Sequence, residues 1–194
     1  MFEPSELISA LGPVISCFAQ LQISYYVGGS VASSYHGASR STMDVDLNAG
    51  LDEVKARAII SALREEYYVS ENAVIDEIRR RSYFNLIHYA TSYKIDVFVD
   101  RNRAFDQSVQ KRAIRGSLGK AVPTVVNYAS PEDIILLKLD WYRQGDCTSE
   151  RQWADLMQVT KMQGHRLDRT YIDHWATELK VADLWKKLII ESNV

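Results

Sequence analysis

The segment Asp44-Val45-Asp46-Leu47 limits the possible folds of this chain more than any other stretch of its sequence. Successive side chains of a strand point to opposite faces, so Asp44 and Asp46 lie on one face. Met43, Val45 and Leu47 then point to the other face, into a core. Two adjacent carboxylates repel each other unless a cation or hydrogen-bond donors lie between them. The segment therefore predicts a strand with a core on one face and a polar site on the other.

A third acid, Asp96, lies in a similar apolar setting within Lys94-Ile95-Asp96-Val97. Hard divalent cations such as Mg²⁺ prefer oxygen ligands. Three carboxylates at the edge of a buried sheet could hold two ions roughly 4 Å apart, the arrangement that supports phosphoryl transfer. Asp44, Asp46 and Asp96 are therefore candidate metal ligands. The alternative for the first two is a pair of exposed strand acids that face water.

A glycine turn precedes the acid pair. The apolar segment Tyr25-Tyr26-Val27 ends at Gly28-Gly29, and Ser30 is a suitable N-cap for a short helix to about Tyr35. Backbone amides at such a turn, next to a helix N-terminus, favour a phosphate group. Glycine pairs also end strands that bind nothing. Their position ahead of the acid pair indicates a strand–helix–strand unit that faces one cleft.

The remaining elements follow from hydrophobic periodicity, turn residues and helix caps. We expect helices at 4–21 (kinked or split at Gly12-Pro13), 51–66, 105–114, 130–142, 151–162, 171–179 and 182–190. We expect strands at 23–27, 44–47, around 73–75, 83–89 and 93–99, with two weak strands or extended loop within 116–126. The sequence thus predicts the α/β class, with a small mixed β-sheet in a core domain, 1–127, and a C-terminal helical region, 128–194, packed on it.

The composition is that of a soluble globular protein and argues against several other classes. The formal net charge of −2, with 25% charged and 46% hydrophobic residues, is ordinary for a soluble globular protein. Cys17 and Cys147 lie too far apart, in unrelated contexts, to indicate a disulfide framework or a zinc site. No basic segment precedes an apolar run near the N-terminus, and no stretch approaches the roughly 20 apolar residues of a membrane span. We therefore expect a cytoplasmic protein with no membrane partner.

The motifs together resemble a known family. Val27-Gly28-Gly29-Ser30 followed by Asp44-Val45-Asp46-Leu47 is similar to the nucleotidyltransferase fold superfamily, which includes DNA polymerase beta and kanamycin nucleotidyltransferase. Ile95-Asp96-Val97 resembles the third, looser element of that family. The order of Arg40, Thr42 and the acid pair is closest to bacterial AbiEii-type toxin nucleotidyltransferases, as is the helix that starts at Ser130-Pro131-Glu132-Asp133. The resemblance covers the first hundred residues well and the last forty hardly at all.

The resemblance implies a function and a set of site residues. Asp44, Asp46 and Asp96 would be catalytic and would coordinate two magnesium ions, with manganese as the alternative. The residues implied to bind the nucleotide are Gly28, Gly29, Ser30, Arg40 and Lys138. The enzyme would move a nucleoside monophosphate from a nucleoside triphosphate such as ATP to a hydroxyl on a protein, a tRNA or a small molecule. A toxin-type role, with an antitoxin or regulatory protein as partner, is the implied context.

Other interpretations of the same residues stay open. The chain could be a non-catalytic nucleotide-binding or interaction protein that retains the fold, or a phosphohydrolase that uses the same acids. Lys138 could simply lie at the border of an apolar helix face, and Arg40 at the surface. The stretch 76–120 has ten basic and five acidic residues, which predicts either a docking surface or a solvated face. We expect Trp141, Trp153, Trp175 and Trp185 in the core of the helical region.

Overall fold

The computed structural model describes residues 4–38, 42, 44–118 and 124–194. Its contacts divide the chain into two compact units. Unit 1 comprises Met1–Gly28 and Ser41–Tyr128, and unit 2 comprises Gly29–Arg40 and Ala129–Val194. The segment Gly29–Arg40 thus belongs to the same unit as the C-terminal part, although it is far from that part in the sequence. The division into 1–127 and 128–194 stays a prediction.

Unit 1 is built on a mixed β-sheet, as the sequence predicted. Within the described residues the sheet has seven strands: β1 (Tyr25–Val27), β2 (Asp44–Ala49), β3 (Tyr67–Tyr68), β4 (Tyr83–His88), β5 (Lys94–Val99), β6 (Ile114–Ser117) and β7 (Val125–Tyr128). Their order is β3-β4-β5-β2-β1-β7-β6. The pairs β2–β5 and β1–β7 are parallel, while the other neighbours are antiparallel. The two strands predicted to carry acids are therefore central neighbours.

The central strands have one apolar and one polar face. Along β2, Val45 and Leu47 are fully buried, whereas Asp44 is exposed and Asp46 is half-buried. Strand β4 alternates in the same way, with Phe84 buried. This alternation confirms the face assignment made from the sequence; Met43 lies outside the described residues. We call the side of the sheet that carries Asp44 and Asp46 the polar face.

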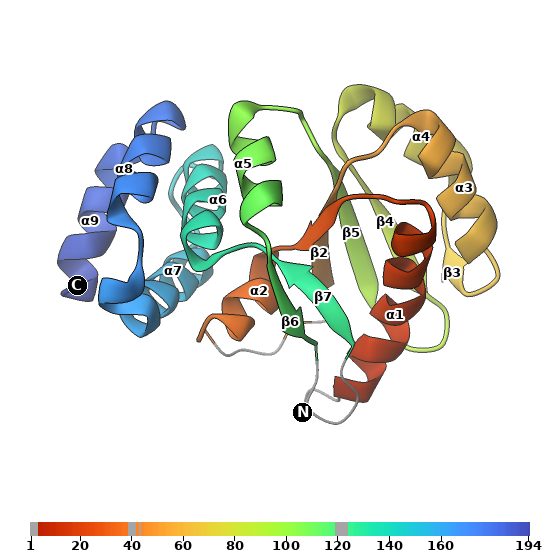
Figure 1. Ribbon diagram of the computed structural model, residues 1–194, viewed down its shortest axis with the longest axis horizontal. Helices are drawn as coiled ribbons and strands as arrows, with labels where there is room; N and C mark the ends of the chain where they lie inside the picture. Colours follow the sequence, from red (N-terminus) through yellow and green to blue (C-terminus); the bar gives the residue numbers. More distant parts are fainter. Residues whose placement is uncertain (1–3, 39–41, 43, 119–123) are drawn as a thin grey trace. The chain divides into compact units, whose positions relative to one another are not determined.

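Four helices complete unit 1: α1 (Pro4–Gln20), α3 (Glu53–Leu63), α4 (Glu71–Arg80) and α5 (Ala104–Arg112). Helix α1 packs on α3, α3 packs on α4, and α4 packs on β4 (Figure 1). Helix α1 continues unbroken through Pro13, so of the predicted kink or split at Gly12-Pro13 the split is wrong and the kink stays a prediction. Proline removes one backbone hydrogen bond from a helix, but Leu11 and Val14, on either side of this site, are fully buried and hold the helix together.

Two further sequence predictions in unit 1 are wrong. The strand expected around 73–75 is part of α4, because Val74, Ile75 and Ile78 have the spacing of one helix face and are buried together. Val54, predicted to lie on the buried stripe of the helix at 51–66, is 79% exposed. Helix α3 instead buries a stripe that includes Ile60. The first error comes from a short apolar run that suits a strand and a helix equally well, and the second from the rotation of a helix about its axis, which local periodicity does not fix.

Unit 2 is helical, with α2 (Gly29–Tyr35), α6 (Pro131–Gln144), α7 (Glu150–Gln163), α8 (Arg169–Glu178) and α9 (Ala182–Ser192). Helix α6 packs on α2, α7 and α8, and α9 packs on α7 and α8 (Figure 1). The predicted start of α6 is confirmed: the Ser130 hydroxyl accepts the backbone N–H of Asp133 at 3.1 Å. None of the described helices is both long and apolar enough to cross a membrane.

The tryptophans of unit 2 do not form a common core. Trp185 is buried, whereas Trp141 is 44% exposed. Trp153 is half-buried, with its ring 5.2 Å from that of Tyr142 and its indole N–H donating to Glu191 at 2.7 Å. The prediction that the four tryptophans lie in the core of the helical region is therefore confirmed for Trp185 and wrong for Trp141, while Trp153 and Trp175 are half-buried. Helical spacing places these residues on helices, but it does not show which side of each helix meets a neighbour.

Candidate metal and nucleotide site

The parallel pairing of β2 with β5 brings the three predicted acids together. Its register sets Asp46 opposite Asp96 and Asp44 opposite Lys94. Asp44 and Asp46 lie two residues apart, so all four side chains occupy two adjacent rows of the polar face. We call Asp44, Asp46 and Asp96 the acid cluster. It lies on the face of two central strands and not at the edge of the sheet, because β2 is paired on both sides.

Lys94 supplies the cation that the acid cluster requires. Its Nζ lies 2.9 Å from Oδ2 of Asp96 and 3.6 Å from Oδ1 of Asp44. The hydrogen bond to Asp96, together with the charges of both acids, raises the pKa of the Lys94 ammonium above its ordinary value. The group is therefore positively charged at neutral pH. Lys94 was not among the residues predicted for the site, although its position two residues before Asp96 already placed it on the same face.

Asn85 holds the other oxygen of Asp96. The antiparallel register of β4 and β5 sets Asn85 opposite Asp96, and its Nδ2 donates a hydrogen bond to Oδ1. Asp96 is buried, at 8% exposed. Its Oδ1 contacts Asn85 and its Oδ2 contacts Lys94, so both oxygens have partners on the sheet. This arrangement fixes the orientation of the carboxylate. Asn85 had no signal in the sequence, because its role depends on which residue of β5 it faces.

The glycine turn joins the two units. In unit 1, the backbone N–H of Gly28 donates to the carbonyl oxygen of Asp46 at 2.8 Å, which fixes the end of β1 beside the acid pair. In unit 2, Gly29 has a φ of 52°, a left-handed conformation that favours glycine, and α2 begins there. Ser30 is buried in the first turn of α2. A phosphate-binding role for Gly28, Gly29 and Ser30, in one cleft with the acid cluster, stays a prediction.

Lys138 has a protein partner. Within unit 2 its Nζ lies 2.8 Å from Oδ2 of Asp155, and the two side chains are only 11% and 7% exposed. The buried amine thus has the partner that its place in an apolar helix required. Its predicted contact with nucleotide stays a prediction. Arg40, the other basic residue assigned to the nucleotide, lies outside the described residues.

The acid cluster has the donor chemistry of a magnesium site. It offers carboxylate oxygens, which hard divalent cations prefer, and a positive charge already lies between Asp44 and Asp96. As the side chains stand, no three His, Cys, Asp or Glu residues of the described chain converge closely enough to hold a metal ion. The acid cluster therefore suits a divalent ion by the type of its donor atoms and by their location on one face. In the metal-free protein the Lys94 ammonium group lies between two of these carboxylates.

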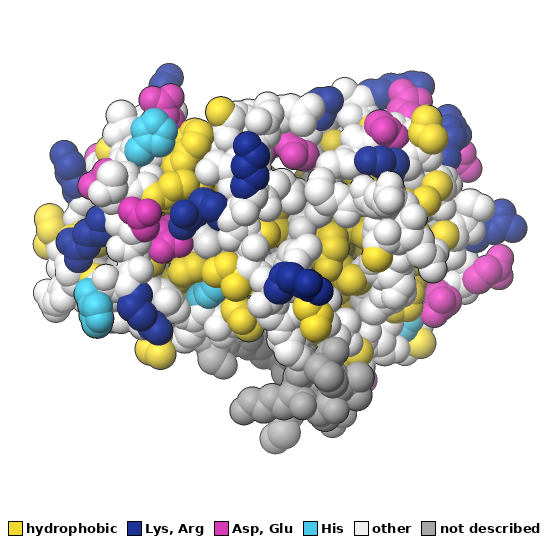
Figure 2. Space-filling view, viewed as in Figure 1, with side chains coloured by type: hydrophobic (Ala, Val, Ile, Leu, Met, Phe, Trp, Pro, Cys, Tyr) yellow, Lys and Arg dark blue, Asp and Glu magenta, His cyan; other side chains and the backbone are white. Residues whose placement is uncertain are grey.

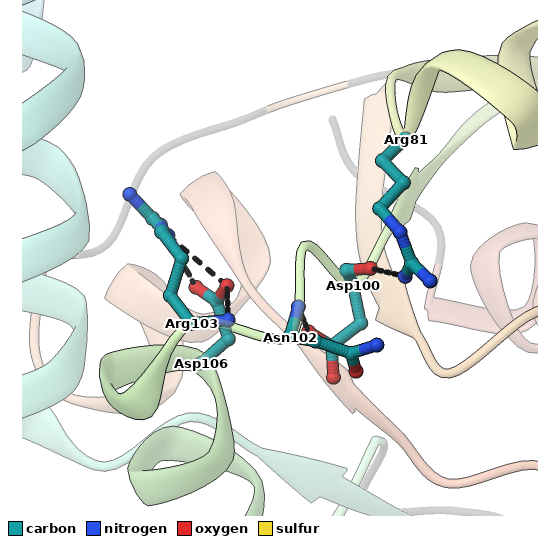
Figure 3. A network of polar contacts seen from close by, with 5 residues as sticks. All are labelled: Arg81, Asp100, Asn102, Arg103 and Asp106. Atoms are coloured by element: carbon teal, nitrogen blue, oxygen red, sulfur yellow. Dashed lines mark hydrogen bonds and ion pairs between the residues drawn. The ribbon is translucent and has the colours of Figure 1, made fainter.

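A polar network holds the connection that leaves β5 (Figure 3). Arg81 donates to the carbonyl oxygen of Asp100 at 2.6 Å, and the Asp100 carboxylate accepts the backbone N–H of Asn102 at 2.6 Å. Arg103 then makes a two-pronged ion pair with Asp106 in the first turn of α5, at 2.8 and 3.0 Å. This network fixes the chain just after the strand that carries Asp96.

Several basic residues of the stretch 76–120 have partners within the protein. Arg79 pairs with Glu53 at 2.9 Å, and Arg80 pairs with Glu77 at 3.5 Å. Arg81 and Arg103 belong to the network of Figure 3. On the face that Figure 2 shows, Lys and Arg side chains are scattered among acidic and apolar ones. These pairs favour the solvated-face interpretation of the stretch; its role as a docking surface stays a prediction.

No protein-family model matches the sequence, and no curated protein matches it. Solved structures do match. The solution structure of the antibiotic-resistance factor ANT(2'')-Ia covers 98% of this chain and 98% of its own, with 12% identity and a TM-score of 0.59. A crystal structure of ANT(2'')-Ia in complex with adenylyl-2''-tobramycin covers 90% and 97%, with 9% identity and a TM-score of 0.57. An antigenic nucleotidyltransferase-like protein from Paracoccidioides brasiliensis covers 95% and 92%, with 20% identity and a TM-score of 0.53.

These likenesses establish the fold. The chain has the nucleotidyltransferase fold, as the resemblance of its glycine turn and acid pair implied. At such low identity, similar structures speak for the fold and not for the chemistry. The narrower resemblance to AbiEii-type toxins is not shown by them and stays a prediction.

Proposed function

We propose that this protein is a magnesium-dependent nucleotidyltransferase that moves a nucleoside monophosphate from a nucleoside triphosphate to a hydroxyl group. One observation carries the proposal: the register of β2 and β5 gathers three carboxylates on one polar face. Carboxylates placed in this way repel one another and add little to stability by themselves. Lys94 offsets part of this repulsion, and a divalent cation held by the same carboxylates would support phosphoryl transfer.

In the proposed reaction, the acceptor oxygen forms a bond to the α-phosphorus and the bond to the pyrophosphate oxygen breaks. When bound, magnesium would stabilise the charge on the transferred group and on the departing pyrophosphate. Asp44, Asp46 and Asp96 would hold the ions, and Asp96 would also orient the acceptor hydroxyl and accept its proton. Asn85, through its hydrogen bond to Oδ1, keeps the Asp96 carboxylate in place. Positioning and charge neutralisation supply most of the rate in such chemistry.

The donor and the acceptor can be ranked for a first test. ANT(2'')-Ia has been solved with an adenylylated antibiotic, which supports ATP as the donor and a small hydroxyl compound as the acceptor. A protein side chain or a tRNA end is the alternative acceptor. The glycine turn and Lys138 are the proposed phosphate contacts. A toxin role and a regulatory protein partner belong to the same proposal and need a separate test in cells.

Thermal unfolding with each of the four nucleoside triphosphates, with and without magnesium, tests the donor site. A ligand that binds only the folded state raises the melting temperature. We expect a magnesium-dependent rise for one triphosphate, absent in the double variant Asp44→Asn/Asp46→Asn. Asp76→Asn, which removes an exposed acid of α4, is the matched control and should keep the rise.

Two alternative functions, a nucleotide-binding scaffold and a phosphohydrolase, give different results in this experiment and in an assay of the released product. A rise that survives chelation of magnesium and the double variant would indicate a nucleotide-binding scaffold. For an active preparation, release of pyrophosphate indicates transfer, whereas release of inorganic phosphate indicates a phosphohydrolase. No rise with any triphosphate would contradict the proposed function.

A further inference from the structure

We propose that Lys94 is a built-in counter-ion of the acid cluster, which a divalent ion must displace in order to bind. Lys94 is thus a positioning residue that sets the affinity of the site for metal. The inference rests on the proposed function, since it takes Asp44 and Asp96 as metal ligands. Lys94, which is not itself a metal ligand, would thus control how readily the acid cluster binds a metal ion.

The geometry gives Lys94 this position. Its Nζ contacts Oδ2 of Asp96 at 2.9 Å and Oδ1 of Asp44 at 3.6 Å, so one ammonium group bridges two carboxylates on adjacent strands. The register fixes the bridge, because Asp44 lies directly opposite Lys94 and Asp96 lies two residues further along the same face. A lysine on any other face of β5 would not reach both acids.

The bridge is able to open. The side chain of Lys94 is 40% exposed and that of Asp44 is 55% exposed, so the ammonium group can move into water. The Asp96 side chain is only 11% exposed, so its carboxylate then depends on Asn85 and on the incoming ion as partners. Asp96 is held on its other side by Asn85, so it keeps its place when the lysine leaves. The acid cluster thus has one mobile cation and one fixed hydrogen-bond donor.

Lys94 and a metal ion exclude each other for electrostatic reasons. Without metal, the ammonium group offsets the repulsion between the carboxylates. With a doubly charged ion a few ångströms away, the same ammonium group is repelled and its two oxygen partners are needed as ligands. Loss of the amine therefore has two opposite consequences: the metal-free protein becomes less stable, and its affinity for metal rises.

Binding of Mn²⁺ alone, without nucleotide, tests this inference by calorimetric titration of the full chain. Lys94→Met, which keeps the length of the side chain, should bind Mn²⁺ about tenfold more tightly than the wild type, a difference of about 1.4 kcal/mol. Its melting temperature without metal should be lower. Lys94→Arg keeps the positive charge, now on a forked donor that can reach both acids, so its affinity should not rise. Arg57→Met, which removes a positive charge from an exposed ion pair of unit 1, is the matched control and should bind as the wild type does.

The possible outcomes separate this inference from the proposed function. Equal Mn²⁺ affinity in the wild type and Lys94→Met, or weaker binding by Lys94→Met, would overturn the counter-ion role and leave the transferase intact. An equal rise in Lys94→Met and Arg57→Met would also overturn it, because net charge and not the bridge would then be responsible. Tight binding that Asp46→Asn retains, or no binding by any variant, would remove the acid cluster as a metal site and both proposals with it.

Discussion

The two units each contain a lysine paired with carboxylates, and the two pairs differ in burial. Lys94 in unit 1 lies between Asp96 and Asp44 with 40% of its side chain exposed. Lys138 in unit 2 pairs with Asp155, and both side chains are about one-tenth exposed or less. The chemical groups are the same and one acid of each pair is buried, but only in the first pair is the lysine well exposed and shared with a second, exposed acid, Asp44.

Burial decides what each pair can do. A buried ion pair loses several kcal/mol if one partner is removed, because the other charge stays behind without water. An exposed pair contributes about 0–1 kcal/mol, so its members separate at little cost. Lys138 and Asp155 thus suit a structural link between α6 and α7, while Lys94 suits a group that leaves when a ligand arrives. The following experiments test that contrast, from the largest expected effect to the smallest.

Lys138→Met should destabilise the protein by about 3–5 kcal/mol, because Asp155 stays buried without its cation. Denaturant unfolding measures the loss. The double variant Lys138→Met/Asp155→Leu, which removes both charges, should recover most of it. If Lys138 instead serves mainly to bind phosphate, the single variant will unfold as the wild type does and lose affinity for triphosphate.

Asp46→Asn should abolish the stabilisation that magnesium and the donor triphosphate give to the wild type. At a ligand concentration near 100 times the dissociation constant, that stabilisation is about 2.7 kcal/mol. Because Asp46 takes part in interactions within the folded protein, the melting temperature of the variant without ligand is measured alongside. A lower melting temperature without ligand would indicate that Asp46 has a structural role.

Asn85→Ala should weaken Mn²⁺ binding about tenfold, because partners that orient a ligand side chain have effects of this order. Calorimetric titration measures the change. Asn127→Ala is a matched control in the same sheet, since its side-chain amide donates to the Tyr25 carbonyl at 3.4 Å and not to an acid. Equal affinities in the two variants would show that Asp96 needs no such support.

The smallest expected effect is a pH dependence of unit 2 through His36. Burial lowers the pKa of His36, whose Nε2 donates to the Ala129 carbonyl at 2.7 Å. Just below the ordinary histidine pKa, the unfolded chain therefore takes up a proton that the folded chain does not, so stability falls as the pH falls through this range. His36→Gln should flatten this part of the profile in thermal unfolding from pH 7.5 to 5. His165→Gln, at an exposed position, should leave it unchanged.

Local patterns predicted those parts of the fold that depend on local chemistry. The alternation around Asp44 and Asp46 gave the two faces of β2, and the Ser130 cap gave the start of α6. The segment around 73–75 shows the limit, because a short apolar run suits a strand and a helix equally well. Packing of Val74 and Ile78 against neighbours decided for the helix. Val54 shows a second limit. It was predicted to be buried and is exposed, because periodicity does not say how a helix is rotated against its neighbour.

The candidate site likewise has features that the local sequence predicts and features that only the packed structure shows. The sequence by itself determined that Asp44 and Asp46 share a polar face, because strand geometry alone sets that relation. Only the tertiary structure decided that Lys94 bridges Asp44 and Asp96, that Asn85 faces Asp96, and that Lys138 pairs with Asp155. These contacts join residues on different elements, and strand register and helix packing create them. Register is set by the burial of whole faces, a property of the assembled unit that no single segment contains.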